Sequence, residues 1–104
     1  MLNLTPHAIT LQRGDGTRVT FEPSGQIARV STVEQVCGEV CGVAVISRTL
    51  GEAQGLPEEG TPCIVSAMVL SAVPGRKGVY APDRGLTAIR ENGQIVAVTR
   101  LVAA

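Results

Sequence analysis

The chain has 104 residues, enough for one hydrophobic core but not two, so we expect a single domain over residues 1–104. Hydrophobic residues make up 44% of the chain and aromatic residues only 2%, which predicts a core of aliphatic side chains. Nine Lys and Arg balance nine Asp and Glu, and a neutral chain lacks the field that attracts nucleic acid polymers or anionic membranes.

The first half of the chain carries two hairpin signals. Residues 7–22 alternate apolar and polar side chains on both sides of the RGDG turn at 13–16, which predicts an antiparallel strand pair. The PSG stretch at 23–25 ends that pair, and residues 26–31 resume as a short strand. Between residues 35 and 50, a valine-rich pattern surrounds Cys41-Gly42, which predicts a second strand, turn and strand.

The second half contains one candidate helix. Residues 51–60 are rich in glycine and carboxylates and are expected to form a loop. The apolar run CIV at 63–65 predicts a strand, Ser66 fits a helix N-cap, and residues 67–74 predict a short helix that Pro74-Gly75 ends. A third hairpin is expected around Asn92-Gly93. The predicted fold is therefore α+β: a β-rich single domain of short, mostly antiparallel strands with one short helix.

Two arginines follow the predicted helix. The helix start at Ser66 favours an anion, and Arg76 and Arg84 can clamp a phosphate or carboxylate with their planar donors. The alternatives are that Ser66 only caps its helix and that Arg76 pairs with Asp83 in a solvated loop. Tyr80 is the sole tyrosine; we expect it in a loop, where it offers a stacking face for a nucleobase or serves as a partly buried anchor.

Other polar residues give weaker signals. His7 is the only histidine, and it acts either as a ligand-binding group or as a hydrogen-bonded residue at the start of the first strand. Cys37, Cys41 and Cys63 lack the frame of a zinc site, so we predict no metal and no cofactor. No catalytic motif is recognisable, which disfavours an enzyme.

The amino-terminal residues predict a cytoplasmic protein. They carry neither a basic start nor a long apolar stretch, so they do not resemble a signal peptide. No run approaches the ~20 apolar residues that span a bilayer. An odd number of cysteines in such a chain favours reduced thiols.

Several segments resemble a group of small phage and prophage proteins that have no assigned function. The similar segments are NLTPHAITL at 3–11, EPSGQIARV at 22–30, GLPEEGTPCIVSAMVLSAVPGR at 55–76 and VYAPD at 79–83. The group often has an aspartate where this chain has Gly78, which weakens any role for an Arg-Asp pair there. The resemblance implies a phage origin and a host-cell cytoplasmic setting. Polar residues near turns within the matching segments are candidate site residues: Thr5, His7, Ser24, Arg29, Ser66, Arg76 and Asp83.

Three functions remain open from the sequence. The first is an oligomeric binding protein that sequesters a nucleotide or another phosphorylated anionic signal in counter-defence, with His7, Arg29, Ser66, Arg76, Tyr80 and Asp83 as ligand-binding residues. The second is a structural or protein-interaction module that pairs with a host or virion partner through its strand edges. The third is a small hydrolase or transferase that uses His7 or Cys41. The aromatic-poor core and the many strand edges predict a homo-oligomer.

Overall fold

The computed structural model describes residues 1–104, and ten of its eleven helices and strands are strands. Its elements, in chain order, are β1 (Leu2–Asn3), β2 (Ile9–Gln12), β3 (Arg18–Phe21), β4 (Arg29–Val40), β5 (Val43–Gln54), β6 (Cys63–Ile64), α1 (Ala67–Ala72), β7 (Val79–Pro82), β8 (Ile89–Glu91), β9 (Gln94–Ala97) and β10 (Leu101–Ala103). The β-rich α+β fold expected from the sequence is confirmed, because one short helix accompanies short strands that pair mostly antiparallel.

A small mixed sheet organises the body of the molecule. Its strand order is β1-β6-β7-β10; β6 pairs in parallel with both neighbours, and β10 runs antiparallel to β7. The apolar run that begins at Cys63 forms the centre of this sheet, and Cys63, Ile64 and Val65 are completely buried. A central strand covered on both faces is expected to be continuously apolar rather than alternating, which is the pattern seen here.

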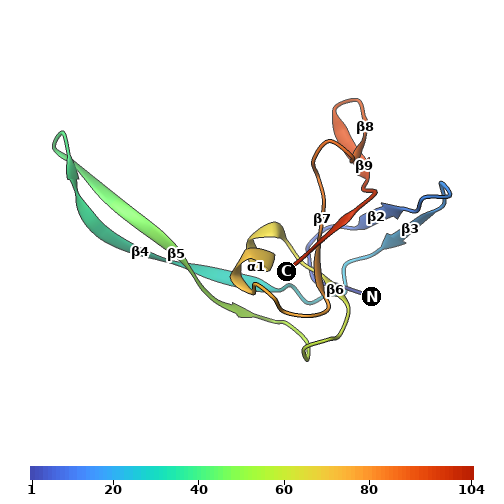
Figure 1. Cartoon of the computed structure of the whole chain (residues 1–104), viewed down its shortest axis with the longest axis horizontal. Coiled ribbons are helices and arrows are strands. Elements are labelled where there is room, and N and C mark those ends of the chain that lie inside the picture. The colour runs from blue at the N-terminus through green and yellow to red at the C-terminus, as the bar shows by residue number, and fades with distance from the viewer.

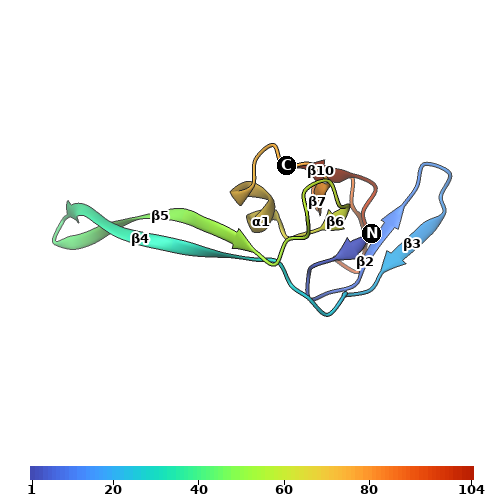
Figure 2. The same cartoon turned by 90° about the horizontal axis from the view of Figure 1, so that it is seen from below.

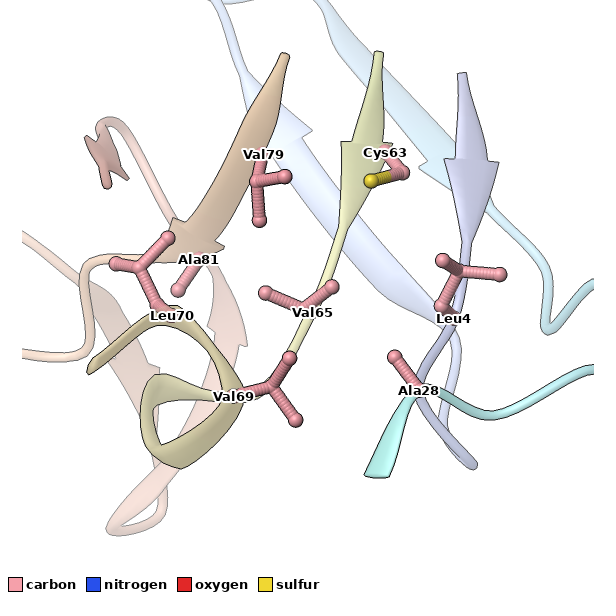
Figure 3. Packing of buried hydrophobic residues seen from close by; sticks show 8 residues of the cluster. All are labelled: Leu4, Ala28, Cys63, Val65, Val69, Leu70, Val79 and Ala81. Atoms are coloured by element: carbon pink, nitrogen blue, oxygen red, sulfur yellow. The ribbon is translucent and has the colours of Figure 1, made fainter. Parts of the chain in front are cut away.

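The core lies between this sheet and the helix (Figure 3). Val69 and Leu70 of α1 pack toward Val65 and toward β7, and Leu4 and Ala28 extend the cluster on the other side of β6. No aromatic side chain belongs to the cluster, as the composition predicted. Each side chain is small, so the hydrophobic stabilisation is spread over many modest contributions.

Three hairpins extend from the body (Figure 1). They are β2–β3, β4–β5 and β8–β9, and all three antiparallel pairings were expected from the sequence. The turn residues Cys41-Gly42 and Asn92-Gly93 both have positive φ angles, 49° and 76° in the first turn and 53° and 79° in the second. Two consecutive residues with positive φ are what a tight two-residue hairpin turn requires.

The structure corrects four local expectations. Residues 26–31 are not a separate strand, because β4 begins at Arg29 and continues for 12 residues. Residues 51–60 are not all loop, because β5 continues to Gln54. The helix ends at Ala72 rather than at residue 74, and Tyr80 lies in β7, not in a loop. The reason for the last error is that β7 is only four residues long, follows Gly78 and ends on Pro82, so turn-type residues mask it in the sequence.

The β4–β5 hairpin projects from the body on its own, as Figures 1 and 2 both show. It gives the molecule principal extents of 55 × 36 × 24 Å. The remaining elements gather around the mixed sheet at the other end. No helix has the length and apolar content that a membrane crossing requires.

Candidate functional site

A cavity of about 620 Å³ opens beside the start of the helix. Three segments that are distant in sequence form its wall: the turn at residues 5–7, residues 65–67 at the β6–α1 junction, and residues 81–85 after the middle of β7. Val65, Leu70 and Ala81 give it an apolar floor, while polar side chains stand around it. This size and mixture are typical of small-molecule sites.

Asn3 holds the turn that carries His7. Asn3 is 1% exposed, and its side-chain amide nitrogen donates to the His7 carbonyl at 2.7 Å and to the Phe21 carbonyl at 2.8 Å. Its amide oxygen accepts from the backbone N–H of Thr5 at 3.0 Å and from the Thr5 hydroxyl at 2.7 Å. The backbone of the turn is therefore fixed, and His7, an exposed residue of this turn, lines the cavity.

The loop after β7 is fixed by Asp83. One carboxylate oxygen accepts from the Gly85 backbone N–H at 3.0 Å, and the other accepts from Arg100 Nη2 at 2.6 Å and Nε at 2.9 Å. The hydrogen bond from Gly85 and those from Arg100 hold the pKa of the Asp83 carboxyl below its usual value. With its oxygens occupied and its charge matched by Arg100, Asp83 shapes the loop.

The loop presents Arg84 to the cavity with its guanidinium free. Arg90 donates to the Arg84 carbonyl at 2.9 Å and to the Gly85 carbonyl at 3.2 Å, so the backbone around Arg84 is held in place. The Arg84 side chain makes no hydrogen bond and no salt bridge within the chain, and both ion pairs of the structure use other residues. Arg84 is therefore the cavity's uncommitted positive charge.

Ser66 occupies the N-cap of α1, as expected. Its hydroxyl accepts from the Val69 backbone N–H at 3.3 Å, a long hydrogen bond. The helix has only six residues and therefore contributes little dipole, so the cavity's attraction for an anion comes from side chains rather than from the helix start. Ser66 is exposed and lines the cavity.

The structure brings three of the six sequence-predicted site residues to this cavity: His7, Ser66 and Asp83. The other three, Arg29, Arg76 and Tyr80, lie elsewhere. Arg29 is at the base of the β4–β5 hairpin, where it lines a separate shallow pocket with Glu52. Tyr80 is a partly buried strand residue whose register partners are Ile64 and Ala103.

Arg76 stabilises a loop and does not line the cavity. Its Nη2 donates to the Pro57 carbonyl at 2.6 Å, which ties the loop before β6 to the end of the helix. Burial raises the pKa of the Cys63 thiol, and the charge of Arg76 offsets part of that effect. The pairing of Arg76 with Asp83 that we considered from the sequence does not occur, since Asp83 pairs with Arg100.

A second, smaller cavity of about 250 Å³ is also lined by His7 and Arg84. Its remaining wall comes from β2 and from β9 with Val98. His7, Pro82 and Arg84 line both cavities, so the two cavities share two residues whose side chains can bind an anion. The sequence singled out Arg84 only as a partner of Arg76, because nothing in the sequence showed that Arg76 would be engaged elsewhere.

The cysteines do not gather at the cavity. Cys37 and Cys41 are exposed on the β4–β5 hairpin, and Cys63 is buried in the core. No group of three or more His, Cys, Asp and Glu side chains is arranged to hold a metal ion. None of the protein-family models, curated proteins and solved structures compared with the chain matches it.

Proposed function

We propose that the protein binds a small anionic ligand of the nucleotide type in the cavity beside α1. The observation that carries the proposal is that His7 and Arg84 line the same cavity, and that the Arg84 guanidinium makes no hydrogen bond or salt bridge within the chain. A guanidinium presents planar paired donors to a phosphate or carboxylate, and an imidazole adds a further hydrogen bond. The backbones that carry both side chains are held by buried or charge-assisted hydrogen bonds, which reduces the entropy cost of binding.

The apolar floor favours a ligand that has a flat or apolar part as well as a charged one. Val65, Leu70 and Ala81 offer such a part an apolar surface, and Arg84 and His7 line the same cavity. A phosphorylated nucleoside combines both features. The one carboxylate of the cavity, Asp83, is matched by Arg100, so it does not leave an uncompensated negative charge beside the ligand.

Binding rather than turnover is the role that these contacts support. Asp83 already accepts from Gly85, Thr87 and Arg100, which leaves it engaged in loop structure rather than free to act as a base. Together with the resemblance to phage proteins, this leads to a sequestering protein that removes a phosphorylated host signal in counter-defence. That setting depends on the resemblance, whereas the ligand class depends on the cavity.

The test is a thermal-melt panel of mono-, di- and cyclic nucleotides. A ligand that binds only the folded chain at 100 times its dissociation constant stabilises it by about 2.7 kcal/mol, a readily measured shift. We expect the Arg84→Ala variant to lose the shift while its ligand-free melt changes little, because an exposed arginine contributes at most about 1 kcal/mol. His7→Ala should weaken the shift.

Two arginines provide matched controls. Arg76→Ala should keep the ligand-induced shift, although its ligand-free melt falls, because its guanidinium is bonded to Pro57 and does not line the cavity. Arg18→Ala, at an exposed position in β3, should change neither. A shift that survives in Arg84→Ala, or one that no nucleotide produces in the wild-type chain, would contradict the proposal. Product formation in a chromatographic assay would show an enzyme instead.

A further inference from the structure

The β4–β5 hairpin, called here the arm, exposes an unusual amount of apolar surface. It touches the core only at its base, where Val30 and Ala53 pack against the buried cluster. Beyond the base it carries seven of the chain's fourteen exposed large hydrophobic residues: Val33, Val36, Val40, Val43, Val45, Ile46 and Leu50. Val36 is 69% exposed, and Val43 is 66% exposed. Figures 1 and 2 show no other element alongside the outer part of the arm.

An arm of this kind is poorly stable by itself. A lone two-stranded hairpin is marginal in water, because its two strands bury little apolar surface between them. Contiguous exposed apolar residues are in turn typical of interaction surfaces. Each strand of the arm has 12 residues, and successive side chains point to opposite faces, so one face offers about half of them. A standard stable interface uses about 20–30 residues on each side, so pairing through one face of the arm makes a small interface.

On one face of the arm, the strand register places a charged pair between two pairs that carry apolar side chains. Three cross-strand pairs alternate onto the same face: Thr32 with Leu50, Glu34 with Arg48, and Val36 with Ile46. Glu34 and Arg48 form an exposed ion pair with 2.7 Å between Oε1 and Nε. One acid and one base therefore sit side by side at the centre, with apolar side chains before and after them.

We propose that this face packs against the same face of the arm in a second copy of the chain, about a two-fold axis parallel to the strands. Such an axis exchanges the two strands while keeping each position along them. Glu34 then lies opposite Arg48 of the second copy, and Val36 lies opposite Ile46 of the second copy. The two ion pairs become a four-charge cluster of alternating sign, enclosed by apolar contacts on both sides.

The charges select both the occupant and its orientation. A two-fold axis across the strands would instead place Glu34 against Glu34 and Arg48 against Arg48, which is repulsive. The three pairs are together neutral and complementary to their own image, so a second copy matches both charges of this series. Glu39 pairs with Ala44 beyond the register shift, nearer the tip of the arm. The proposal concerns the arm alone and stands independently of ligand binding at the cavity.

The test uses complementary charge reversals in the full-length chain. The Glu34→Arg variant carries two arginines on the face and the Arg48→Glu variant carries two glutamates, so each should repel its own copy. Mixed together, the two variants again oppose arginine to glutamate at every contact. By sedimentation and light scattering under reducing agent, we expect a wild-type dimer, a dissociation constant raised about tenfold or more for each variant alone, and a dimer in the mixture.

Glutamate substitutions at two valines distinguish the roles of the two faces of the arm. Val36→Glu should abolish the dimer, whereas Val33→Glu, on the same strand but the opposite face, should retain it. Leu86→Glu, at a fully exposed position outside the arm, controls for a general effect of the added charge. A monomeric wild-type chain would overturn the proposal and leave the arm to a different protein. A wild-type dimer whose mixed variants fail to associate, or which Val33→Glu breaks equally, would also overturn it.

Discussion

At the scale of single residues, the decisive polar groups are those whose hydrogen bonds are already committed. Asn3 uses all of its amide to fix the turn at residues 5–7, and Asp83 uses both oxygens to fix the loop at 83–90. Because these two residues hold the backbone, His7 and Arg84 keep free side chains at one cavity. The groups available for binding are those that the fold holds in place without using their side chains in internal hydrogen bonds.

Some of these residues could be predicted from the sequence as site residues, but their individual roles could not. His7, Ser66 and Asp83 were expected near a site, and they do line one cavity. Arg76 and Arg84 have the same chemistry and lie in the same turn-rich region, so only the contact of Arg76 with Pro57 distinguishes them. Asn3 gave no sequence signal, because its importance depends on the burial of partners as distant as Phe21.

The lowered pKa of Asp83 predicts a pH dependence of stability. A carboxyl whose pKa is lower in the folded chain than in the unfolded chain stabilises the fold above its unfolded value, about 4, and this contribution is lost as the pH falls through the folded pKa. The Asp83→Asn variant lacks this stabilising contribution at every pH. Denaturant unfolding between about pH 6 and pH 3 should therefore show a gap between wild type and variant that narrows below about pH 4.

Arg100 provides the complementary variant for this measurement. Arg100→Gln removes the charge that helps to lower the Asp83 pKa but leaves the hydrogen bond from Gly85, the largest cause, in place. It should therefore reduce the pH dependence only in part. A wild-type chain and an Asp83→Asn variant with the same loss of stability on acidification would show that Asp83 does not supply it.

At the scale of elements, the turn residues allowed the hairpins to be predicted from the sequence, whereas the shortest strands could not be predicted. Cys41-Gly42 and Asn92-Gly93 predicted their hairpins because positive φ angles restrict the choice of residues. β1 and β7 were missed because two or four residues between turn signals have no visible period, and their pairing with β6 is long-range. Tyr80 was misplaced for this reason.

Gly51 explains why the arm is longer than expected. From the sequence, Gly51 was predicted to begin a loop. It lies instead within β5, next to a register shift opposite Ser31. A Cβ on Gly51 would come within 2.6 Å of the Ser31 hydroxyl oxygen, so glycine permits the two strands to approach closely there. Glycine in a strand often marks such a bulge.

Gly78, which begins the approach to β7, should tolerate no side chain. Its φ is +82°, and an added Cβ would lie 2.8 Å from both the Gly60 carbonyl carbon and the Thr61 carbonyl oxygen. The backbone strain and the overlap together predict a loss of about 3 kcal/mol in the free energy of unfolding for Gly78→Ala. Gly75 has a similar φ of +78° but open space around it, so Gly75→Ala should cost only about 1 kcal/mol.

Denaturant unfolding of the two alanine variants isolates the steric contribution, since both substitutions impose nearly the same backbone strain. Equal losses for Gly75→Ala and Gly78→Ala would mean that the loop at 60–61 moves aside and that the close approach to Gly78 is not required. A larger loss for Gly78→Ala would show that the close approach of the loop at 60–61 requires glycine at this position.

At the scale of the whole molecule, a small core supports an extended shape. Only 14 of the 104 residues are buried, and the radius of gyration is 16.7 Å, whereas a compact chain of this length has about 13 Å. The difference comes from the arm, whose outer part is stabilised only by its own cross-strand pairing. We therefore expect the two ends of the molecule to differ in local stability.

Hydrogen exchange at two protein concentrations measures this difference directly. Amides of β6 and β7 lie in the buried sheet and should exchange slowly at every concentration, because their opening requires disruption of the core. Amides of the arm should exchange quickly when the chain is dilute and become protected when it is concentrated, because a second copy that binds only the folded arm stabilises it by mass action. The β2–β3 hairpin is the internal control, since it is also two-stranded but is not part of the proposed interface, and its exchange should not depend on concentration. Arm exchange that is identical at both concentrations would show that no second copy covers the arm.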